Sequence, residues 1–256
     1  MKIGVFQMEV VTAEPFQNLE KVRHILRTND CQIYVLPELW STGFCNKQFA
    51  ELAPVCDEIE EQIAELSRQH NCTIIGSMLK KSPAGIHNHL SSYNRGVKEL
   101  EYNKIHLFTL LREERYLIGG NSRGLAHSPD NGIYGAGICY DLRFPEMFRA
   151  LAVDKAAMIF LPSQWPMERL DHFRTLCIAR AIENQAFFIS CNNVGRLHEK
   201  MQFAGHSLVV DPWGKVLAEG SGEQEELLIC LVDPAKSDEV RQMIPVFRDR
   251  KPELYQ

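Results

Sequence analysis

The chain has 256 residues, of which 45% are hydrophobic, and a formal net charge of −5 at pH 7. This length can bury a sizeable core, and because no Pro-, Gly- or Ser-rich linker divides it, we expect a single domain over residues 1–256. The mixed charges argue against a nucleic-acid-binding protein, which would carry a clustered basic surplus. Its apolar runs are too short to cross a bilayer. We therefore expect small-molecule partners, with no nucleic acid and no membrane.

The N-terminus and the cysteines indicate the compartment. The segment MKIGVFQMEV lacks the long apolar core and the small-residue cleavage site of a signal peptide. The eight cysteines have no CxxC spacing, so we expect a cytoplasmic protein with reduced thiols and no disulfides. His87 and His89 could lie on one side of a strand and share a metal, but the sequence offers no third ligand. We predict no metal and no cofactor.

The first half of the chain alternates between strands and helices. The β-rich runs are KIGVFQM, QIYVLP and CTIIGSML. Residues 15–28 and 47–70, which lie between them, carry apolar side chains at helical spacing and predict a βαβαβ order. After Gly85, the runs HNHLSSYNR and GVKELEYNKIHLF predict paired strands around Gly96.

A second alternation looks like a repeat of the first. It comprises the strand before Cys139, a helix over residues 145–153, the run AAMIFLP, a helix over residues 167–184 and the run AFFISCNNVG. The segment AGHSLVVDPWGKVLAEG then predicts a hairpin, because Pro212 presets φ and Gly214 tolerates a positive φ in the turn. These patterns give the α/β class, with stacked layers of helices and sheets.

Cys139 is the first candidate for chemistry. It follows an apolar run with several glycines and precedes the helix that begins near Pro145. Free N–H groups and the positive end of a helix dipole at such a turn favour the reactive thiolate. We predict a cysteine nucleophile. The alternative is a buried structural thiol, and seven other cysteines compete with Cys139 for the role.

Two charged residues at strand ends could assist such a nucleophile. Glu38 directly follows the apolar run that ends at Pro37, where α/β folds place active sites, and desolvation would raise its proton affinity. Lys104 interrupts a strand-like run and would need a carboxylate, a thiolate or an oxyanion as its partner. Taken singly, Glu38 is more often a loop residue and Lys104 more often a snorkelling side chain, since spacing alone does not bring them together.

Three longer motifs carry a family resemblance: LPELW around Glu38, YNKIHLF around Lys104 and GICYDLRFPE around Cys139. In this order, and together with MKIGVFQ, RAIENQAFFISCNNVG and GHSLVVDPWG, they resemble the nitrilase superfamily, the carbon-nitrogen hydrolases, over nearly the whole chain. The resemblance implies a four-layer αββα sandwich that forms a homodimer by pairing sandwiches.

The resemblance also implies roles for individual residues. Glu38 would be the general base, Lys104 the oxyanion stabiliser and Cys139 the nucleophile that forms a thioester. The backbone N–H of Tyr140 would complete the oxyanion site.

A second glutamate is expected seven residues before the glycine of a terminal "AGN" motif. The matching segment here is EERYLIGGN, and counting back from Gly120 gives Glu113. Gly119 stands where alanine is usual, and the adjacent Glu114 remains an alternative to Glu113.

The residues after Cys139 indicate the branch of the superfamily and a group of charged side chains that could support the turn. True nitrilases commonly carry a Trp-Glu pair there, whereas Tyr140 and Asp141 resemble the amidase and carbamoylase branches. We expect Asp141 and Arg143, with Glu146 as a further partner, to form paired charges that support the turn.

The substrate is the least specified feature. The segment PSQWP and the run that ends in NNVG resemble the bacterial ω-amidases, which release ammonia from 2-oxoglutaramate and related ω-amides, although Asn193 stands where arginine is frequent. The alternatives are an N-carbamoyl amino acid amidohydrolase or another small-amide amidase, and an inert binding module with the same fold. Candidate substrate-binding residues are Phe44, Trp165 and Phe203, which could equally be packing residues. The basic residue for a distal carboxylate is not identified.

Overall fold

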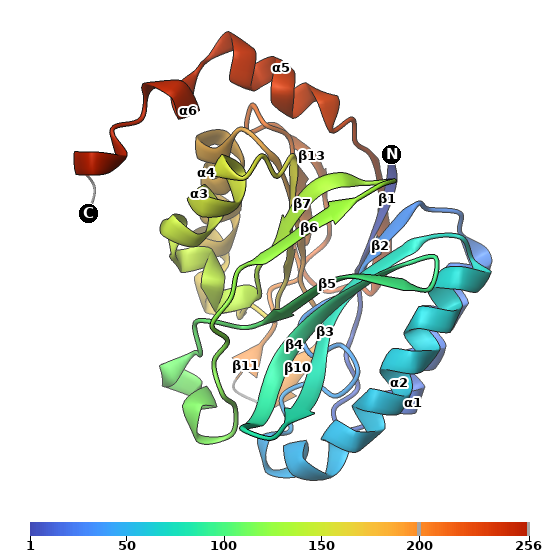
Figure 1. The fold of residues 1–256 in the computed structure, drawn as a ribbon. Helices are drawn as coiled ribbons and strands as arrows, with labels where there is room; N and C mark the ends of the chain where they lie inside the picture. Colours follow the sequence, from blue (N-terminus) through green and yellow to red (C-terminus); the bar gives the residue numbers. More distant parts are fainter. Residues whose placement is uncertain (199–200, 255–256) are drawn as a thin grey trace.

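The computed structural model describes residues 1–198 and 201–254, and two six-stranded sheets form the centre of the fold (Figure 1). The first sheet contains, in spatial order, β14 (Glu226–Leu231), β1 (Lys2–Gln7), β2 (Ile33–Val35), β3 (Thr73–Ser82), β4 (Gly85–Asn94) and β5 (Val97–Asn103). The second contains β13 (Val216–Glu219), β12 (Leu208–Val210), β9 (Phe187–Cys191), β8 (Met158–Pro162), β7 (Gly132–Ala136) and β6 (Gly124–Ser128).

Two pairs of helices form the outer layers. Helices α1 (Pro15–Thr28) and α2 (Phe49–Gln69) cover the first sheet, and α3 (Pro145–Val153) and α4 (Leu170–Asn184) cover the second (Figure 1). The apolar face of α1, with Leu19, Val22 and Ile25, is buried because its residues recur at helical spacing. The predicted four-layer αββα sandwich is confirmed. Within the described residues, no helix is both long and apolar enough to cross a membrane.

The two sheets have the same internal order. In the first, β1, β2 and β3 are parallel and are followed by the antiparallel β4 and β5. In the second, β7, β8 and β9 are parallel and are followed by the antiparallel β12 and β13. An antiparallel edge strand, β14 or β6, completes each sheet. The prediction that the second half repeats the first is therefore confirmed.

The largest apolar core lies between the sheets. Strand β1 directs Ile3 and Val5 into this core and Phe6 toward the helices, as expected for side chains that alternate along a strand. From the second sheet, Tyr134 and Phe160 belong to the same core. Because both faces of the parallel strands are covered, these strands consist of nearly continuous apolar residues.

Several elements differ from the sequence prediction. The expected helix over residues 167–184 begins with a 3-10 turn, Met167–Arg169, before α4. The helix expected over residues 47–70 likewise begins with the 3-10 turn Asn46–Gln48. The hairpin at the DPWG turn is present between β12 and β13, with Gly214 at a φ of +83°. Strands β6 and β14 and the C-terminal helices α5 (Ala235–Met243) and α6 (Val246–Asp249) were not predicted.

Candidate active site

Three strand ends bring the predicted site residues together. Glu38 follows β2, Lys104 directly follows β5, and Cys139 begins the 3-10 helix Cys139–Arg143 that follows β7. The first two strands belong to one sheet and β7 to the other, so the residues meet where the two sheets face each other. Sequence spacing alone could not establish this convergence.

Lys104 connects two carboxylates. Its Nζ lies 2.7 Å from Oε1 of Glu38 and 3.0 Å from Oε1 of Glu113, and all three side chains are buried. Glu114, the alternative for the second glutamate, is exposed. The geometry therefore selects Glu113 over Glu114 as the neighbour of Lys104.

Two residues that the sequence analysis missed orient the carboxylate of Glu38. Nδ2 of Asn88 on β4 donates to Oε1 of Glu38 at 2.8 Å, and the backbone N–H of Gln164 donates to Oε2 at 3.1 Å. The side-chain amide of Gln164 also donates to the backbone oxygen of Glu38 at 2.6 Å. With Lys104, these donors fix both oxygens of the carboxylate.

The charges of the site shift the pKa values of its members. Burial alone would lower the pKa of Lys104, but the charges of Glu38 and Glu113 outweigh it and raise the pKa above its ordinary value. The pKa of Glu113 is raised because burial outweighs the attraction of Lys104, and the charge of Glu38 adds to the rise. Lys104 is therefore a fixed cation at neutral pH.

Cys139 has an unusual backbone and a protonated thiol. Its φ of +46° lies in the left-handed region, which costs energy for a residue with a Cβ and is typical of functional turns. Burial raises the pKa of the thiol well above its ordinary value, and the charge of Glu38 raises it further, against the opposing effect of Lys104. The expectation that the turn by itself favours the thiolate is wrong, because desolvation is the larger effect. The thiol needs a base.

The scaffold around Asp141 also differs from the expectation. Oδ2 of this fully buried carboxylate accepts hydrogen bonds from the hydroxyl of Tyr102 at 2.7 Å and from the backbone N–H of Ile138 at 2.8 Å. Oδ1 accepts one from the backbone N–H of His106 at 3.2 Å and lies 2.8 Å from its Nδ1. Asp141 therefore ties the segment after Lys104 to the turn that carries Cys139.

Arg143 and Glu146 do not take part in this network, so the expected charge pair with Asp141 is wrong. The Arg143 guanidinium lies instead 4.9 Å from the centre of the Trp165 ring, and Glu146 is exposed. Nη2 of Arg143 also lies 3.4 Å from Nδ1 of His172, and the remaining N–H groups of the guanidinium are available to another partner in the pocket.

The glycine pair of the GGN motif lies against the strand end that carries Lys104. The N–H of Gly120 donates to the backbone oxygen of Lys104 at 2.9 Å, and a Cβ on Gly120 would lie 2.1 Å from the backbone oxygen of Asn103. Only glycine fits this close approach. At Gly119, where alanine is usual, a Cβ would lie 3.1 Å from the oxygen of Ile105, which is tight but less severe.

A pocket of about 370 Å³ opens at Cys139. Its walls are mostly aromatic and aliphatic, with two arginines, and consist of Phe44, Phe108, Leu111, Glu113, Cys139, Tyr140, Arg143, Gln164, Trp165, Pro166, Arg169 and Met201. The predicted residues Phe44 and Trp165 are among them. Phe203 is not: it is buried and pairs with Pro166 through the backbone, so it supports the wall from behind.

Tyr140 lies in the pocket wall directly after the nucleophile candidate. Its ring packs on Phe108, with the ring centres 4.7 Å apart, and edge-on against Phe144 at 5.3 Å. Within the described part of the chain, its backbone N–H has no hydrogen-bond acceptor. It is therefore free to donate to an anion beside Cys139.

Comparisons with known proteins identify the family of the chain. The model of the carbon-nitrogen hydrolase family matches residues 2–242. A 2-oxoglutaramate amidase from Bacillus subtilis (strain 168) is 37% identical over 262 residues, which cover 99% of this chain and 98% of that protein. The omega-amidase NIT2 from Homo sapiens is 29% identical over 99% of this chain and 96% of its own length.

A solved structure has the same fold. XC1258 from Xanthomonas campestris, a CN-hydrolase superfamily protein with an arsenic adduct in its active site, superposes with a TM-score of 0.91 at 25% identity. The superposition covers 98% of this chain and 97% of that one. The family match includes the segments of Glu38, Lys104 and Cys139, so the resemblance found in the sequence is confirmed. The chain is an enzyme and belongs to the carbon-nitrogen hydrolase family.

Proposed function

We propose that this hydrolase is an ω-amidase in which Glu38, Lys104 and Cys139 act together on a small amide. The observation that carries the proposal is a fully buried cation, Lys104, within hydrogen-bond distance of Glu38 and of Glu113, which lines the same pocket as Cys139. A protonated thiol with a raised pKa needs a neighbouring base, and Glu38 is the carboxylate that contributes most to its electrostatic surroundings.

In the first half of the reaction, the carboxylate of Glu38 accepts the thiol proton while Sγ of Cys139 attacks the amide carbon. The amide oxygen becomes an oxyanion, to which the ammonium of Lys104 and the N–H of Tyr140 donate hydrogen bonds. Glu38 then transfers its proton to the amide nitrogen as the C–N bond breaks. The products of this half are ammonia and a thioester on Cys139.

In the second half, Glu38 accepts a proton from a water molecule that attacks the thioester carbon. The same oxyanion site stabilises the second tetrahedral intermediate. When the C–S bond breaks, the carboxylic acid leaves and Glu38 returns its proton to the sulfur. Asn88 and the N–H of Gln164 hold the carboxylate of Glu38 in one orientation through both halves.

Two arginines in the pocket support an anionic substrate. Arg143 lies over Trp165 and Arg169 lies 5.8 Å from the ring centre of Phe108, and neither forms an ion pair with a carboxylate among the residues described. Cations of this kind in a mostly apolar pocket suit a substrate with a distal carboxylate. 2-Oxoglutaramate carries one, and amidases of that name are relatives of this chain.

Asn193 stands where arginine is frequent in the ω-amidases, but this difference does not weaken the proposed ω-amidase function. Asn193 is buried outside the pocket wall, so an arginine at this position is not required for the positive charge of the pocket. Its side-chain amide has no hydrogen-bond partner among the described residues.

Ammonia release tests the substrate. We expect the purified protein to release ammonia from 2-oxoglutaramate with a much higher kcat/KM than from N-carbamoyl amino acids. A preference for N-carbamoyl amino acids would instead support the carbamoylase alternative and overturn the ω-amidase assignment.

Substitution of the nucleophile tests the mechanism. Cys139→Ala should lower the rate by at least about 10⁴-fold with an unchanged circular dichroism spectrum. Cys230→Ala, at the other partly exposed thiol, is the matched control and should retain full activity. Substantial turnover by Cys139→Ala would contradict the mechanism, and a wild-type protein that hydrolyses neither class of substrate would favour an inert binding module.

A further inference from the structure

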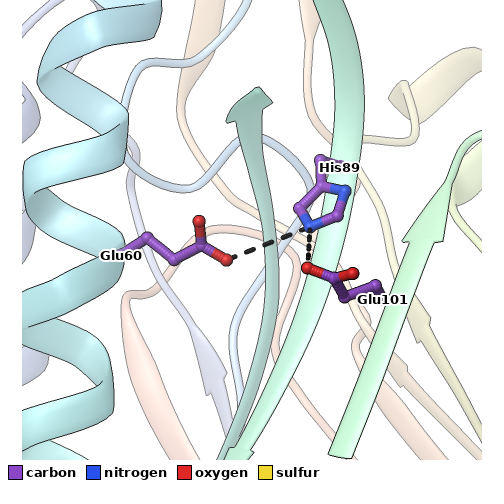
Figure 2. A group of neighbouring side chains, drawn as sticks. All are labelled: Glu60, His89 and Glu101. Carbon is purple, nitrogen blue, oxygen red and sulfur yellow. Dashed lines mark ion pairs between the residues drawn. The ribbon is translucent and has the colours of Figure 1, made fainter. Parts of the chain in front are cut away.

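A second cluster of ionisable side chains lies on the far side of the first sheet from Glu38. Figure 2 shows Glu60 of α2, His89 of β4 and Glu101 of β5 pointing toward one another. Nε2 of His89 lies 3.9 Å from Oε1 of Glu60 and 4.0 Å from Oε1 of Glu101. The sequence analysis considered a metal at His87 and His89 and found no third ligand. His87 is instead engaged with Ser82 and the backbone oxygen of Ile118.

The imidazole of His89 presents an unused lone pair to this cluster. Nδ1 lies 2.8 Å from Oδ1 of Asn103, which can only accept, so Nδ1 carries the proton and Nε2 does not. His89 is only 7% exposed, and Nε2 has no hydrogen-bond partner among residues 1–198 and 201–254. The unused lone pair of this buried nitrogen faces the carboxylates of Glu60 and Glu101.

The ammonium of Lys98 already bridges the two carboxylates, but it stands at the end of a long and partly exposed side chain. Nζ of Lys98 lies 3.1 Å from Oε1 of Glu60 and 2.5 Å from Oε1 of Glu101. The side chain of Lys98 is 30% exposed, so its ammonium can turn into solvent without unpacking the core. Its ammonium marks the position where positive charge is favourable.

Other residues hold Glu60 in place independently of Lys98. Nζ of Lys80 lies 2.6 Å from Oε2 of Glu60, and the hydroxyl of Tyr93 donates to Oε1 at 3.0 Å. Asn103 orients His89 in the same way. Outer partners that fix the orientation of each ligand are characteristic of metal sites in proteins.

We propose that Glu60, His89 and Glu101 bind a divalent first-row transition metal ion such as Zn²⁺ or Co²⁺, which takes the place of the Lys98 ammonium. One imidazole nitrogen and two carboxylate oxygens suit these ions better than Ca²⁺ or Mg²⁺, which prefer oxygen ligands alone. The three ligand atoms lie within 4.8 Å of one another. Bonds of about 2.0–2.2 Å in tetrahedral geometry require separations of about 3.4 Å, so only small side-chain movements are needed.

The charges of the cluster agree with this exchange. In the described part of the chain, three carboxylates, those of Asp57, Glu60 and Glu101, are in contact with two ammonium groups, those of Lys80 and Lys98. Replacing one ammonium with a divalent ion balances the charges.

The metal site is distinct from the catalytic pocket but adjoins it through the backbone. His89 and Asn103 face each other across β4 and β5. Their sequence neighbours Asn88 and Lys104 donate to Glu38 on the other face of the sheet. The two groups of side chains thus alternate along the same two strands.

Titration with Co²⁺, followed by visible absorption and equilibrium dialysis, tests the proposal. We expect one Co²⁺ per chain, with the d–d spectrum of nitrogen and oxygen ligands. A thiolate charge-transfer band, which would report binding to cysteines, would count against the proposal. Glu101→Gln, at a side chain that is 58% exposed, should abolish the binding without affecting the fold, and His89→Gln should do the same.

The competing ammonium provides the sharper test. Lys98→Met keeps the aliphatic stem but removes the competing cation, so it should tighten Co²⁺ binding at least about 10-fold. Lys80→Met is the matched control, because it also removes an ammonium from Glu60 but does not vacate the space beside His89. If both variants tightened Co²⁺ binding equally, the cause would be the loss of any positive charge near Glu60. That result would overturn the proposal. Absence of binding by both the wild type and Lys98→Met would also overturn it.

Discussion

Lys104 is one buried cation between two buried carboxylates, and this imbalance explains much of the site. Removing such charges from water costs several kcal/mol per ion unless good pairing offsets it. Burial raises the pKa of Glu113 against the attraction of Lys104, and the charge of Glu38 raises it further. Glu113 also accepts the backbone N–H of Phe108 at 3.0 Å. These contacts make Glu113 a positioning residue for Lys104 in the proposed mechanism.

Substitution of the two neighbouring glutamates tests this role. We expect Glu113→Gln to lower kcat about 10- to 100-fold with little change in KM, because a neutral amide would hold the Lys104 ammonium less firmly in its reactive position. Glu114→Gln is the control, since Glu114 is exposed and should be silent. Steady-state kinetics on the same amide measures both variants. Equal impairment by the two substitutions would be inconsistent with the role of Glu113.

The sequence identified some of these residues and not others for a physical reason. Glu38, Lys104 and Cys139 each interrupt or follow an apolar run, where a charge or thiol is conspicuous. Asn88 is inconspicuous in a strand that already contains many polar residues. Gln164 reaches Glu38 from 126 positions away, and only the fold creates that contact.

In addition to its apolar face, helix α2 carries one buried acid, Glu60, that contacts three strands of the first sheet. The carboxylate contacts Lys80 of β3, Tyr93 of β4 and Lys98 of β5. Although burial opposes ionisation, the hydrogen bonds and charges of Lys80 and Lys98 lower the pKa of Glu60 from 4.5 to about 2. A carboxylate with a depressed pKa stabilises the folded state at pH values where it is ionised in both states.

The stability of this helix–sheet contact should therefore depend on acid. The contribution of Glu60 is fully present above about pH 4.5 and is lost as the pH falls through about 2. The shift corresponds to roughly 3 kcal/mol in the free energy of unfolding. Urea unfolding of the wild type and Glu60→Gln should differ most above pH 5, with a difference that shrinks toward pH 2. A difference independent of pH would rule out ionisation as the cause.

The position of β14 at the edge of its sheet explains why the sequence did not predict this strand. Residues Glu226–Leu231 of β14 are mostly half-buried or exposed, with no clean alternation, so their pattern does not identify a strand. Their partner is β1, at the opposite end of the chain. By contrast, β1 and α1 were predicted nearly to their ends, because full burial on a sheet face or a helix face imposes a regular apolar period.

Several exposed apolar residues lie near the C-terminal end of α4. Ile182 on α4 is 50% exposed, Trp213 in the β12–β13 turn is 46% exposed, and Met243 at the end of α5 is 69% exposed. The turn packs against Ile182, and Nε2 of Gln185, just after α4, donates to the backbone oxygen of Ile244 after α5 at 2.8 Å. These apolar side chains therefore lie around the same end of α4.

We propose that this end of α4 belongs to the interface of the homodimer that the family resemblance implies. Exposed apolar residues that cluster on one surface are typical of subunit contacts. The protein should sediment with twice the mass of one chain. Ile182→Glu should shift it to the monomer, because an unpaired carboxylate would be buried between the subunits while the isolated fold, where Ile182 is half exposed, tolerates it. Val97→Glu is the matched control, since Val97 is 65% exposed on β5 of the other sheet and should leave the dimer intact. A monomeric wild type would contradict the dimer. A dimer that Val97→Glu disrupts and Ile182→Glu does not would place the interface elsewhere.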